Sequence, residues 1–226
     1  IIRKLHNHGL DYVYIQDKDT DDVMANDIVS AETKRKALKE LRTHFSSIAD
    51  PRVQKSAYPI IGKTFAGIVD SILSELSTNP EVMVMLMSMH TKDHYLYHHS
   101  LNVCIYTLLL GKVHGYSVDE LRVLGIGSLL HDVGKAHIPN DILFKPGRLT
   151  DEEYNTIKLH TEYGFKILKD EPGIPLLAAH CAYQHHERLN GSGYPRGLTE
   201  PDIHGYAKWI GIADSYDALT TSRVYR

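Results

Sequence analysis

The placement of histidine constrains the fold of this chain more than any other feature. Of its 15 histidines, 12 lie between His90 and His204. Two of them, His185 and His186, are adjacent and precede the glycine-rich segment "RLNGSGYPRGL". A buried imidazole needs a partner for its ring nitrogens, so a core holds many of them only within a polar network or around a shared metal ion. This distribution favours metal chemistry in the second half of the chain.

The composition is that of an ordinary soluble globular protein. The 226 residues are 42% hydrophobic and 23% charged, which suits one large domain or a main domain with a smaller one. The net charge of −3 gives no sign of a polybasic surface for a nucleic-acid polymer or a membrane. No apolar run reaches the roughly 18–20 residues that span a bilayer. Cys104 and Cys181 are too few for a disulfide framework and suit a reducing compartment, so we expect a cytoplasmic location.

The chain divides near residue 50. Residues 1–25 contain the alternating run "YVYI" after a helical segment, which predicts a small α/β fragment. Residues 27–45 have the composition of an exposed helix, and "SSIADPRVQKSAYP" is predicted to be a linker. We therefore expect an N-terminal accessory fragment with its linker over residues 1–50 and a second, helical domain over residues 51–226.

Helical signals dominate after residue 50. An apolar stripe at helical spacing is formed by Ile61, Phe65, Ile68, Ile72 and Leu76. The Met-rich segment "EVMVMLMSMH" predicts another helix, with its methionines in the core. The capping boxes "SVDE" and "TDEE" predict helix starts at Ser117 and Thr150. Strand patterns are scarce, so the predicted fold is an all-α bundle preceded by a small α/β fragment.

The segment "LLHDVGKAHIP" combines a buried helix end with polar residues. His131 and Asp132 are adjacent, about 100° apart on a helix, so both can reach one point beside it. Lys135 follows four residues after His131 and is expected on the same face. A buried aspartate beside a histidine is costly unless both are paired or bound to a cation. A structural His–Asp hydrogen bond and a metal site explain this segment equally well.

Other candidates occupy inward-facing helical positions. His160 lies on the apolar face of its helix, where Gly164 leaves room for a close approach, and a lone core histidine is usually only hydrogen-bonded. Taken together, however, the set contains five imidazoles and two carboxylates: His99, His131, Asp132, His160, His185, His186 and Asp214. Mixed nitrogen and oxygen donors suit iron, manganese or zinc better than magnesium or calcium. Seven donors are too many for one tetrahedral ion and fit two ions that share a carboxylate.

Five segments together resemble the HD-GYP family, a branch of the HD superfamily of helical metal-dependent phosphohydrolases. They are "HSLNV", "HDVGKAHIP", "LHTEYGFKIL", "HHERLNGSGYPRGL" and "IADSYDALTTSRVYR", in the family's order and spacing. They cover about residues 93–226. The resemblance implies that residues 51–226 form an HD-GYP catalytic domain, a helical bundle whose C-terminus is expected to be truncated. The residues before about 50 resemble the end of a small domain that precedes some members.

The resemblance also implies which residues hold metal. One ion is expected on His99, His131, Asp132 and Asp214, and a second on Asp132, His160, His185 and His186, with Asp132 bridging. Iron or manganese is the expected metal, with zinc, nickel, cobalt or magnesium as alternatives. Some members bind a third ion through a glutamate at the position of Tyr95 here. We therefore expect two ions, with His94 or Asp93 as outside candidates for a third.

The implied activity is hydrolysis of a cyclic dinucleotide, either cyclic di-GMP or 3′,3′-cyclic GMP-AMP, to a linear 5′-phosphorylated dinucleotide and then to mononucleotides. Two cations lower the pKa of a bridging water, and the resulting hydroxide attacks phosphorus in line. Asp132 and Lys135 are the implied catalytic residues. Lys135, Arg223 and Arg226 are the implied contacts to the substrate phosphates, although Val224 stands where the family usually has proline. The sequence does not decide between the two substrates.

Three other functions stay open: a catalytically silent receptor for the same ligand, an HD phosphohydrolase acting on mononucleotides or nucleic-acid ends, and a di-iron oxygenase on the same scaffold. The expected partner is the cyclic dinucleotide, without a nucleic-acid polymer. The stripe of residues 61–76 can pack internally or form a dimer helix, and the resemblance favours a homodimer. Glu187 is expected to orient a metal ligand. Tyr194 is expected to support the metal-bearing helix end, with direct substrate contact as the less favoured alternative.

Overall fold

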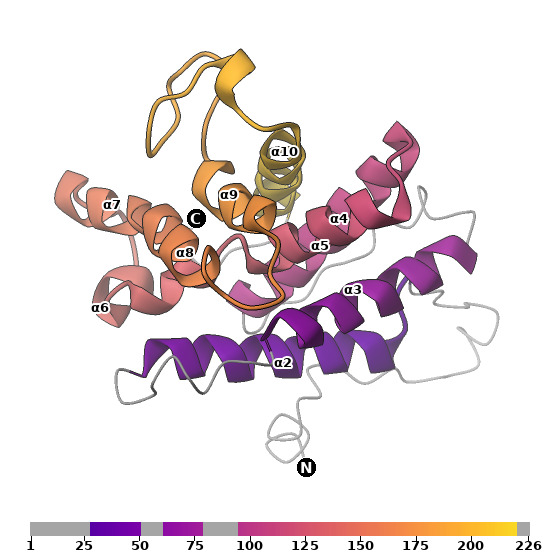
Figure 1. The fold of residues 1–226 in the computed structure, drawn as a ribbon. Coiled ribbons are helices and arrows are strands. Elements are labelled where there is room, and N and C mark those ends of the chain that lie inside the picture. Colours follow the sequence, from indigo (N-terminus) through magenta and orange to yellow (C-terminus); the bar gives the residue numbers. More distant parts are fainter. Residues whose placement is uncertain (1–27, 51–60, 79–94, 221–226) are drawn as a thin grey trace, which may run out of the picture.

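The computed structural model describes residues 28–50, 61–78 and 95–220, which form a bundle of helices (Figure 1). In chain order the helices are α2 (Ala31–Ala49), α3 (Ile61–Thr78), α4 (Tyr95–His114), α5 (Val118–Leu130), the 3-10 helix η3 (Val133–His137), α6 (Asn140–Leu143), α7 (Asp151–Lys158), α8 (His160–Leu168), α9 (Leu176–Gln184), the 3-10 helix η4 (Glu200–Asp202) and α10 (Gly205–Thr220). These residues contain no strand beyond a single β-bridge between Asn190 and Thr199. The predicted all-α bundle is therefore confirmed.

Both predicted capping boxes are present. The Ser117 hydroxyl accepts a hydrogen bond from the Glu120 amide (3.3 Å), and the Glu120 carboxylate accepts one from the Ser117 amide (2.8 Å). Thr150 and Glu153 make the same pair of bonds, at 3.2 and 2.8 Å. Each box satisfies two backbone N–H groups that a helix start otherwise leaves unpaired. They fix the starts of α5 and α7, whose C-terminal ends lead into His131 and His160.

The predicted apolar stripe of α3 is buried inside the bundle. Its members are Ile61, Phe65, Ile68, Ile72 and Leu76, each at most 3% exposed. The helix packs on α2, α4 and α5. The stripe therefore packs within this chain, and a homodimer, which stays a prediction, would need a different surface.

Helix α2 corrects the expectation of an exposed helix. Ala37, Leu41, Phe45 and Ile48 are buried, and the helix packs on α3, α4 and η3. The spacing of these residues makes one narrow apolar stripe. The lysines and glutamates of α2 lie on its remaining surface and dominate its overall composition. Composition alone therefore predicted an exposed helix. The division of the chain at residue 50 stays a prediction, and α2 shares the hydrophobic core of the bundle.

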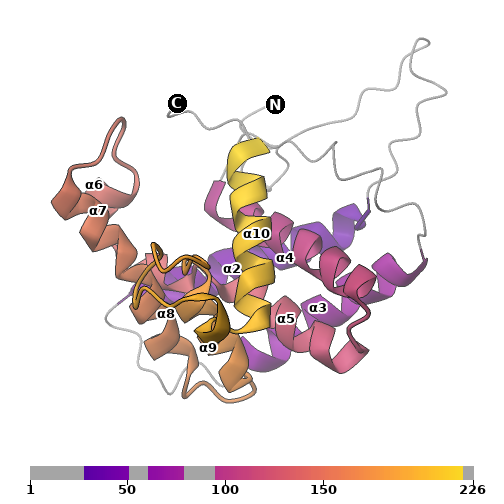
Figure 2. The ribbon, with the colours of Figure 1, turned by 90° about the horizontal axis from the view of Figure 1, so that it is seen from above.

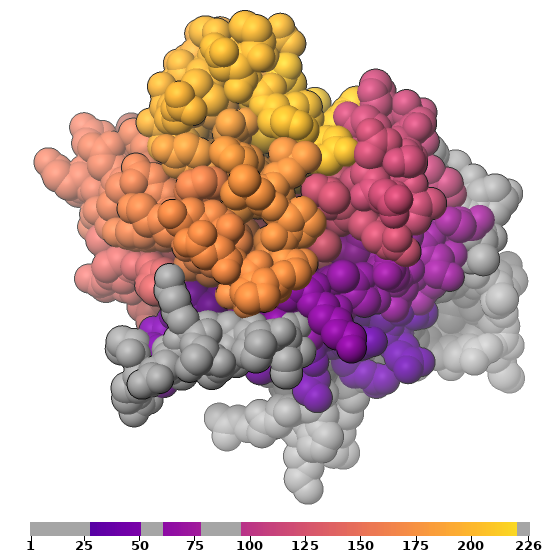
Figure 3. Space-filling model, in the orientation of Figure 1, coloured from indigo at the N-terminus to yellow at the C-terminus, as the bar shows by residue number. Residues whose placement is uncertain are grey.

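The helices converge on one region. Helix α10 packs on α4 and α9, α8 packs on α9 and η3, and α5 packs on α4 and α9. In Figure 1, α2 and α3 form a layer beneath α4 and α5, and Figure 2, seen from above, shows α10 lying over α4. Figure 3 shows the orange α8–α9 segments against the purple α3. Segments far apart in the sequence are thus brought around one centre.

Several predictions fall outside the described residues. They concern the α/β fragment of residues 1–25, residues 51–59 of the predicted linker, the Met-rich helix, the candidate ligands Asp93 and His94, and the substrate contacts Arg223 and Arg226 with the neighbouring Val224. The first four residues of the predicted linker, 46–49, are instead the last turn of α2, which continues to Ala49. Within the described part of the chain, no helix combines the length and the apolar character needed to cross a bilayer.

Candidate metal centre

The structure brings all seven predicted metal ligands together from five parts of the bundle. His99 lies on α4, His131 and Asp132 follow the end of α5, His160 begins α8, His185 and His186 follow α9, and Asp214 lies on α10. Their donor atoms form two groups, within each of which all atoms lie within 4.8 Å of one another. One group is Asp132, His160, His185 and His186, and the other is His99, His131 and Asp214.

The carboxylate of Asp132 faces both groups. Its Oδ1 atom lies 3.4 Å from Nε2 of His160 and 3.8 Å from Nε2 of His185. Its Oδ2 atom lies 3.4 Å from Nε2 of His131 and 3.7 Å from Nε2 of His99. The two oxygens of one side chain therefore point to different halves of the site, which is the arrangement that a bridging ligand requires.

Backbone carbonyls fix the tautomer of three of these histidines. The Nδ1–H groups of His131, His160 and His185 donate to the carbonyls of Ser128 (2.7 Å), Ile157 (2.7 Å) and Ala182 (3.0 Å). These carbonyls lie in the last turns of α5, α7 and α9, where a helix leaves its C=O groups without an internal partner. A carbonyl can only accept, so the proton is on Nδ1 and each Nε2 carries a lone pair.

These lone pairs converge without a hydrogen between them. Nε2 of His160 lies 3.3 Å from Nε2 of His185, and both face Oδ1 of Asp132. Among the described residues, His131 Nε2 and Asp132 Oδ1 are buried atoms with no hydrogen-bond partner. Leaving a buried polar atom unpaired costs about 1–3 kcal/mol, and more for a charged group. A cation in each half of the site would turn these opposed lone pairs into ligands, so the residues fit a metal centre.

The protonation states also fit. Burial lowers the pKa of His160 to about 4 and that of His186 to about 3, so both rings are neutral near pH 7. Burial alone would raise the pKa of Asp132, but the ammonium group of Lys135 holds it well below its usual range. Burial would likewise raise the pKa of Asp214, and the hydrogen bond from His99 lowers it. Neutral imidazoles and ionised carboxylates are the forms that bind metal.

His99 is held by an aspartate that the sequence did not single out as a site residue. Its Nδ1 lies 2.7 Å from Oδ2 of Asp217, whose other oxygen accepts a hydrogen bond from Asn102 (2.9 Å). Nε2 of His99 lies 3.1 Å from Asp214. Asp217 is one helical turn after Asp214 and 1% exposed. That spacing in an otherwise apolar helix is the signal that could have identified Asp217 as a further site residue.

Metal binding is expected to release a proton from His99. Burial would lower the pKa of this ring, but the carboxylates of Asp214 and Asp217 raise it to about 9 in the metal-free protein. The ring is therefore protonated below about pH 9, and a cation on Nε2 must displace that proton. Apparent metal affinity should rise with pH up to about 9 and then level off. Calorimetric titration at pH 7.5 in buffers of different protonation enthalpy should show about one proton released through His99.

His99→Ala is the control for this release. The variant should release about one proton fewer per protein chain than the wild type when both are saturated with metal. A wild-type titration with no buffer dependence would contradict the raised pKa.

A close backbone contact places Asp132 beside His160. A Cβ atom on Gly134 of η3 would lie 1.9 Å from the carbonyl oxygen of His160 and 2.5 Å from the amide nitrogen of Gly164. Only a residue without a side chain allows η3 to approach α8 this closely. The expected role of Gly164, room for a close approach, agrees with this contact.

Lys135 lies elsewhere than expected. Helix α5 ends at Leu130, so Lys135 is not on the helical face of His131 but in η3, where its ammonium group pairs with Oδ2 of Asp132. The turn that begins at Asp132 reorients the chain. Lys135 nevertheless lines the cavity beside the two donor groups.

Glu187 also has a different role from the one expected. Its carboxylate accepts hydrogen bonds from the amides of Arg196 and Leu198, both at 2.8 Å. It therefore holds the glycine-rich loop rather than orienting a metal ligand. Carboxylate bonds to backbone N–H groups are charge-assisted and strong.

The Tyr194 loop covers the donor group that contains His186. The ring of Tyr194 stacks on His186 with ring centroids 4.7 Å apart and planes 28° apart, and its amide donates to the His186 carbonyl (3.2 Å). A Cβ atom on Gly193 would lie 2.4 Å from the amide nitrogen of Arg188, so the loop requires glycine there. This packing agrees with the expectation that Tyr194 supports the metal-bearing helix end.

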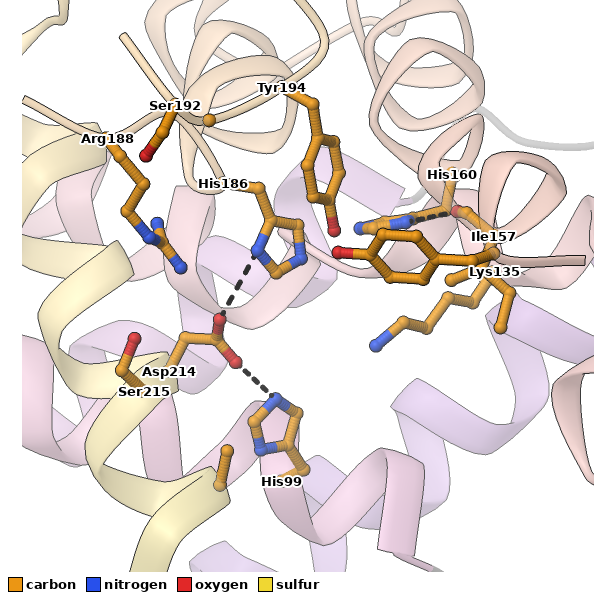
Figure 4. A pocket seen from close by; sticks show the side chains of 13 residues that line it. His99, Lys135, Ile157, His160, His186, Arg188, Ser192, Tyr194, Asp214 and Ser215 are labelled. Atoms are coloured by element: carbon orange, nitrogen blue, oxygen red, sulfur yellow. Dashed lines mark hydrogen bonds and ion pairs between the residues drawn. The ribbon is translucent and has the colours of Figure 1, made fainter. Parts of the chain in front are cut away.

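A cavity of about 580 Å³ opens onto both donor groups (Figure 4). Its lining includes His99, His160, His186 and Asp214, with Lys135 and Arg188 as its cations. Figure 4 shows Lys135 and Arg188 on opposite sides of His186 and Asp214. Arg188, which the sequence did not suggest, is held by the carbonyls of His185 (3.1 Å) and Glu187 (3.0 Å). Such a cavity suits a ligand with negative charge near the donor groups.

Comparison with known proteins gives a consistent result. Residues 82–226 match the family described as "HD domain". The chain is 35% identical over 159 residues to a cyclic di-GMP phosphodiesterase of Pseudomonas aeruginosa, covering 70% of this chain and 38% of that protein. It is 38% identical over 144 residues to a 3'3'-cGAMP-specific phosphodiesterase of Vibrio cholerae, covering 64% of this chain and 33% of that protein. It thus spans about a third of the length of these relatives.

A solved structure shares the fold. Bd1817, an HDG"Y"P protein from Bdellovibrio bacteriovorus, is similar to this chain with a TM-score of 0.67. The similarity covers 88% of this chain and 63% of that one, at 20% sequence identity. At this level of identity, the likeness concerns the arrangement of the helices alone.

Proposed function

This chain belongs to the HD-domain family, and on that premise we propose that it is the catalytic part of a metal-dependent phosphodiesterase acting on a cyclic dinucleotide. The substrate is cyclic di-GMP or 3′,3′-cyclic GMP-AMP, since relatives are named for one or the other. The product is a linear dinucleotide with a 5′-phosphate, and a second cut gives mononucleotides. The predicted membership of the HD superfamily is confirmed by the family match.

The observation that carries this proposal is the convergence of lone pairs on the two sides of Asp132. His160, His185 and His186 would hold one ion, His99, His131 and Asp214 the other, and Asp132 both. When bound, two such ions lower the pKa of a water and neutralise charge on a phosphodiester. The mixed nitrogen and oxygen donors support transition metals, and we propose two ions of iron or manganese.

The remaining roles belong to side chains of the cavity. Lys135 is held beside the donor groups by Asp132, where its positive charge can offset negative charge on the phosphoryl oxygens. Arg188 supplies a second fixed cation. Tyr194 keeps the ring of His186 in place by stacking on it. Arg223 and Arg226 are proposed to contact substrate phosphates from beyond the described residues.

The proposal extends to partners and location. A cyclic dinucleotide, rather than a nucleic-acid polymer, fits a cavity of about 580 Å³ and a net charge of −3. Cys104 and Cys181 are buried free thiols, which supports the cytoplasm as the compartment.

Hydrolysis assays test the proposal directly. The protein loaded with Mn²⁺ or Fe²⁺ should open at least one of the two cyclic dinucleotides, because its cavity presents two sets of metal ligands to one phosphodiester. Product analysis by chromatography should show the linear 5′-phosphorylated dinucleotide first, and the protein treated with a chelator should be inactive. A protein that binds metal and either compound but turns over neither would be a receptor and not an enzyme.

A further inference from the structure

One wall of the cavity has no part in the metal centre. Helix α7 contributes Tyr154 and Ile157, which are three residues apart and therefore on one face of the helix. The residues nearest the donor groups are imidazoles, a carboxylate and the two cations. The cavity thus joins a charged region to an aromatic and aliphatic wall, as expected for a ligand with an anionic part and a flat, weakly polar part.

The ring of Tyr154 is supported from outside the cavity. The ammonium group of Lys158, one turn further along α7, lies 4.8 Å from the centroid of the Tyr154 ring. Lys158 does not line the cavity, whereas Tyr154 does. The same ammonium group lies 5.9 Å from the centroid of the Tyr194 ring, so one cation orients both rings. The Tyr154 side chain is 46% exposed, so a large part of its surface is open to a ligand.

The neighbouring aromatic side chain is already engaged. Tyr194 stacks on His186 and lies 6.3 Å from His160 and 6.4 Å from Tyr154, as measured between ring centroids. The planes of Tyr194 and Tyr154 are 81° apart. A row of rings thus leads outward from the donor groups, and Tyr154 is its outer and more exposed member.

We propose that Tyr154 is a specificity-determining residue on which one purine base of the substrate stacks. The inference rests on the proposed function: a phosphodiester at the donor groups must carry its nucleosides away from them, toward the walls of the cavity. An aromatic side chain holds a base by stacking against its flat π-face. Lys158 fixes the angle of the ring, and Ile157 extends the apolar surface beside it. A purine covers more of this surface than a pyrimidine does.

Steady-state kinetics with the manganese-loaded protein test the proposal. Tyr154→Ala should raise KM for the cyclic dinucleotide about tenfold, within the range that base stacking supplies, and should lower kcat by much less. Tyr154→Phe should recover most of the loss, because it keeps the ring and removes only the hydroxyl. The matched control is Tyr163→Ala: Tyr163 also lies under a lysine, Lys166, at 5.9 Å, but it does not line the cavity.

Binding measurements separate this inference from the proposed function. Calorimetry should show that Tyr154→Ala weakens binding of GMP but not of ribose 5-phosphate, which has the phosphate and lacks the base. If the wild type is active and Tyr154→Ala has the same KM as Tyr163→Ala, the role of Tyr154 is overturned and the proposed function stands. If the wild type turned over neither cyclic dinucleotide but bound GMP in a way that depends on Tyr154, the proposed function would be overturned and the stacking role would stand. Equal loss of both ligands in Tyr154→Ala, or no GMP binding to the wild type, would overturn the stacking role.

Discussion

Replacing Asp132 by alanine is expected to empty both halves of the metal centre and to abolish hydrolysis. The two oxygens of this carboxylate face different donor groups, so its removal takes a ligand from each. Loss of a residue that does not bind the metal itself but orients one of its ligands costs roughly 10–100-fold in metal affinity. A shared ligand should cost more than that at both sites. Elemental analysis should find almost no metal in the purified variant, and the hydrolysis assay should find no product.

Two controls show whether this effect is specific. His160→Ala removes a ligand from one group alone, and should leave one ion bound. Asp170→Ala removes an aspartate that lies far out in solvent, with its side chain 75% exposed, and should change nothing. Thermal unfolding without metal should confirm that Asp132→Ala is folded, because the variant loses the ion pair with Lys135 as well as a buried oxygen that has no hydrogen-bond partner in the described structure. Metal occupancy retained in Asp132→Ala would contradict the bridging role.

Gly134→Ala is expected to disrupt the centre without touching a ligand. The added methyl group would lie within 2.8 Å of three backbone atoms of His160 and Gly164, none of which can rotate away. Helix η3 must then move off α8, which separates Asp132 from His160. Overpacking of this kind costs about 1–3 kcal/mol in the free energy of unfolding. Thermal unfolding without metal should show the destabilisation, and a metal titration should show a lower affinity.

The matched control is another glycine-to-alanine change. Gly67 lies in α3 with nothing within 4 Å of an added Cβ atom. Gly67→Ala should be neutral or stabilising, because alanine favours a helix over glycine by about 1 kcal/mol. If Gly134→Ala unfolded and bound metal like the wild type, the close contact between η3 and α8 would not be what positions Asp132.

The sequence predicted the fold class and the set of residues that meet at the centre. Capping boxes and helical spacing are local features, and so Ser117, Thr150 and the α3 stripe could be identified from neighbouring residues alone. The seven candidate ligands stood out because imidazoles and carboxylates are rare at inward-facing helical positions. Their metal-binding role stays a proposal, but the structure places all of them around Asp132.

Contacts between distant segments could not be predicted in the same way. The pairing of His99 with Asp217 joins residues 118 positions apart, and nothing near Asp217 in the sequence points to His99. Lys135 was placed on the wrong face because the α-helix ends at Leu130, before the lysine. Glu187 looked like a residue that orients a ligand, whereas its partners are amides nine and eleven residues further along the loop. In each case the decisive partner is set by how the helices pack.

Anomalous diffraction from crystals of the manganese-loaded protein is the most direct measurement of the shared centre. Two peaks roughly 3.5–4 Å apart are expected, one on each side of the Asp132 carboxylate. One peak should lie among the Nε2 atoms of His160 and His185, and the other near His99 and His131. A single peak, or peaks that Asp132 does not join, would contradict the two-ion centre and the mechanism proposed from it.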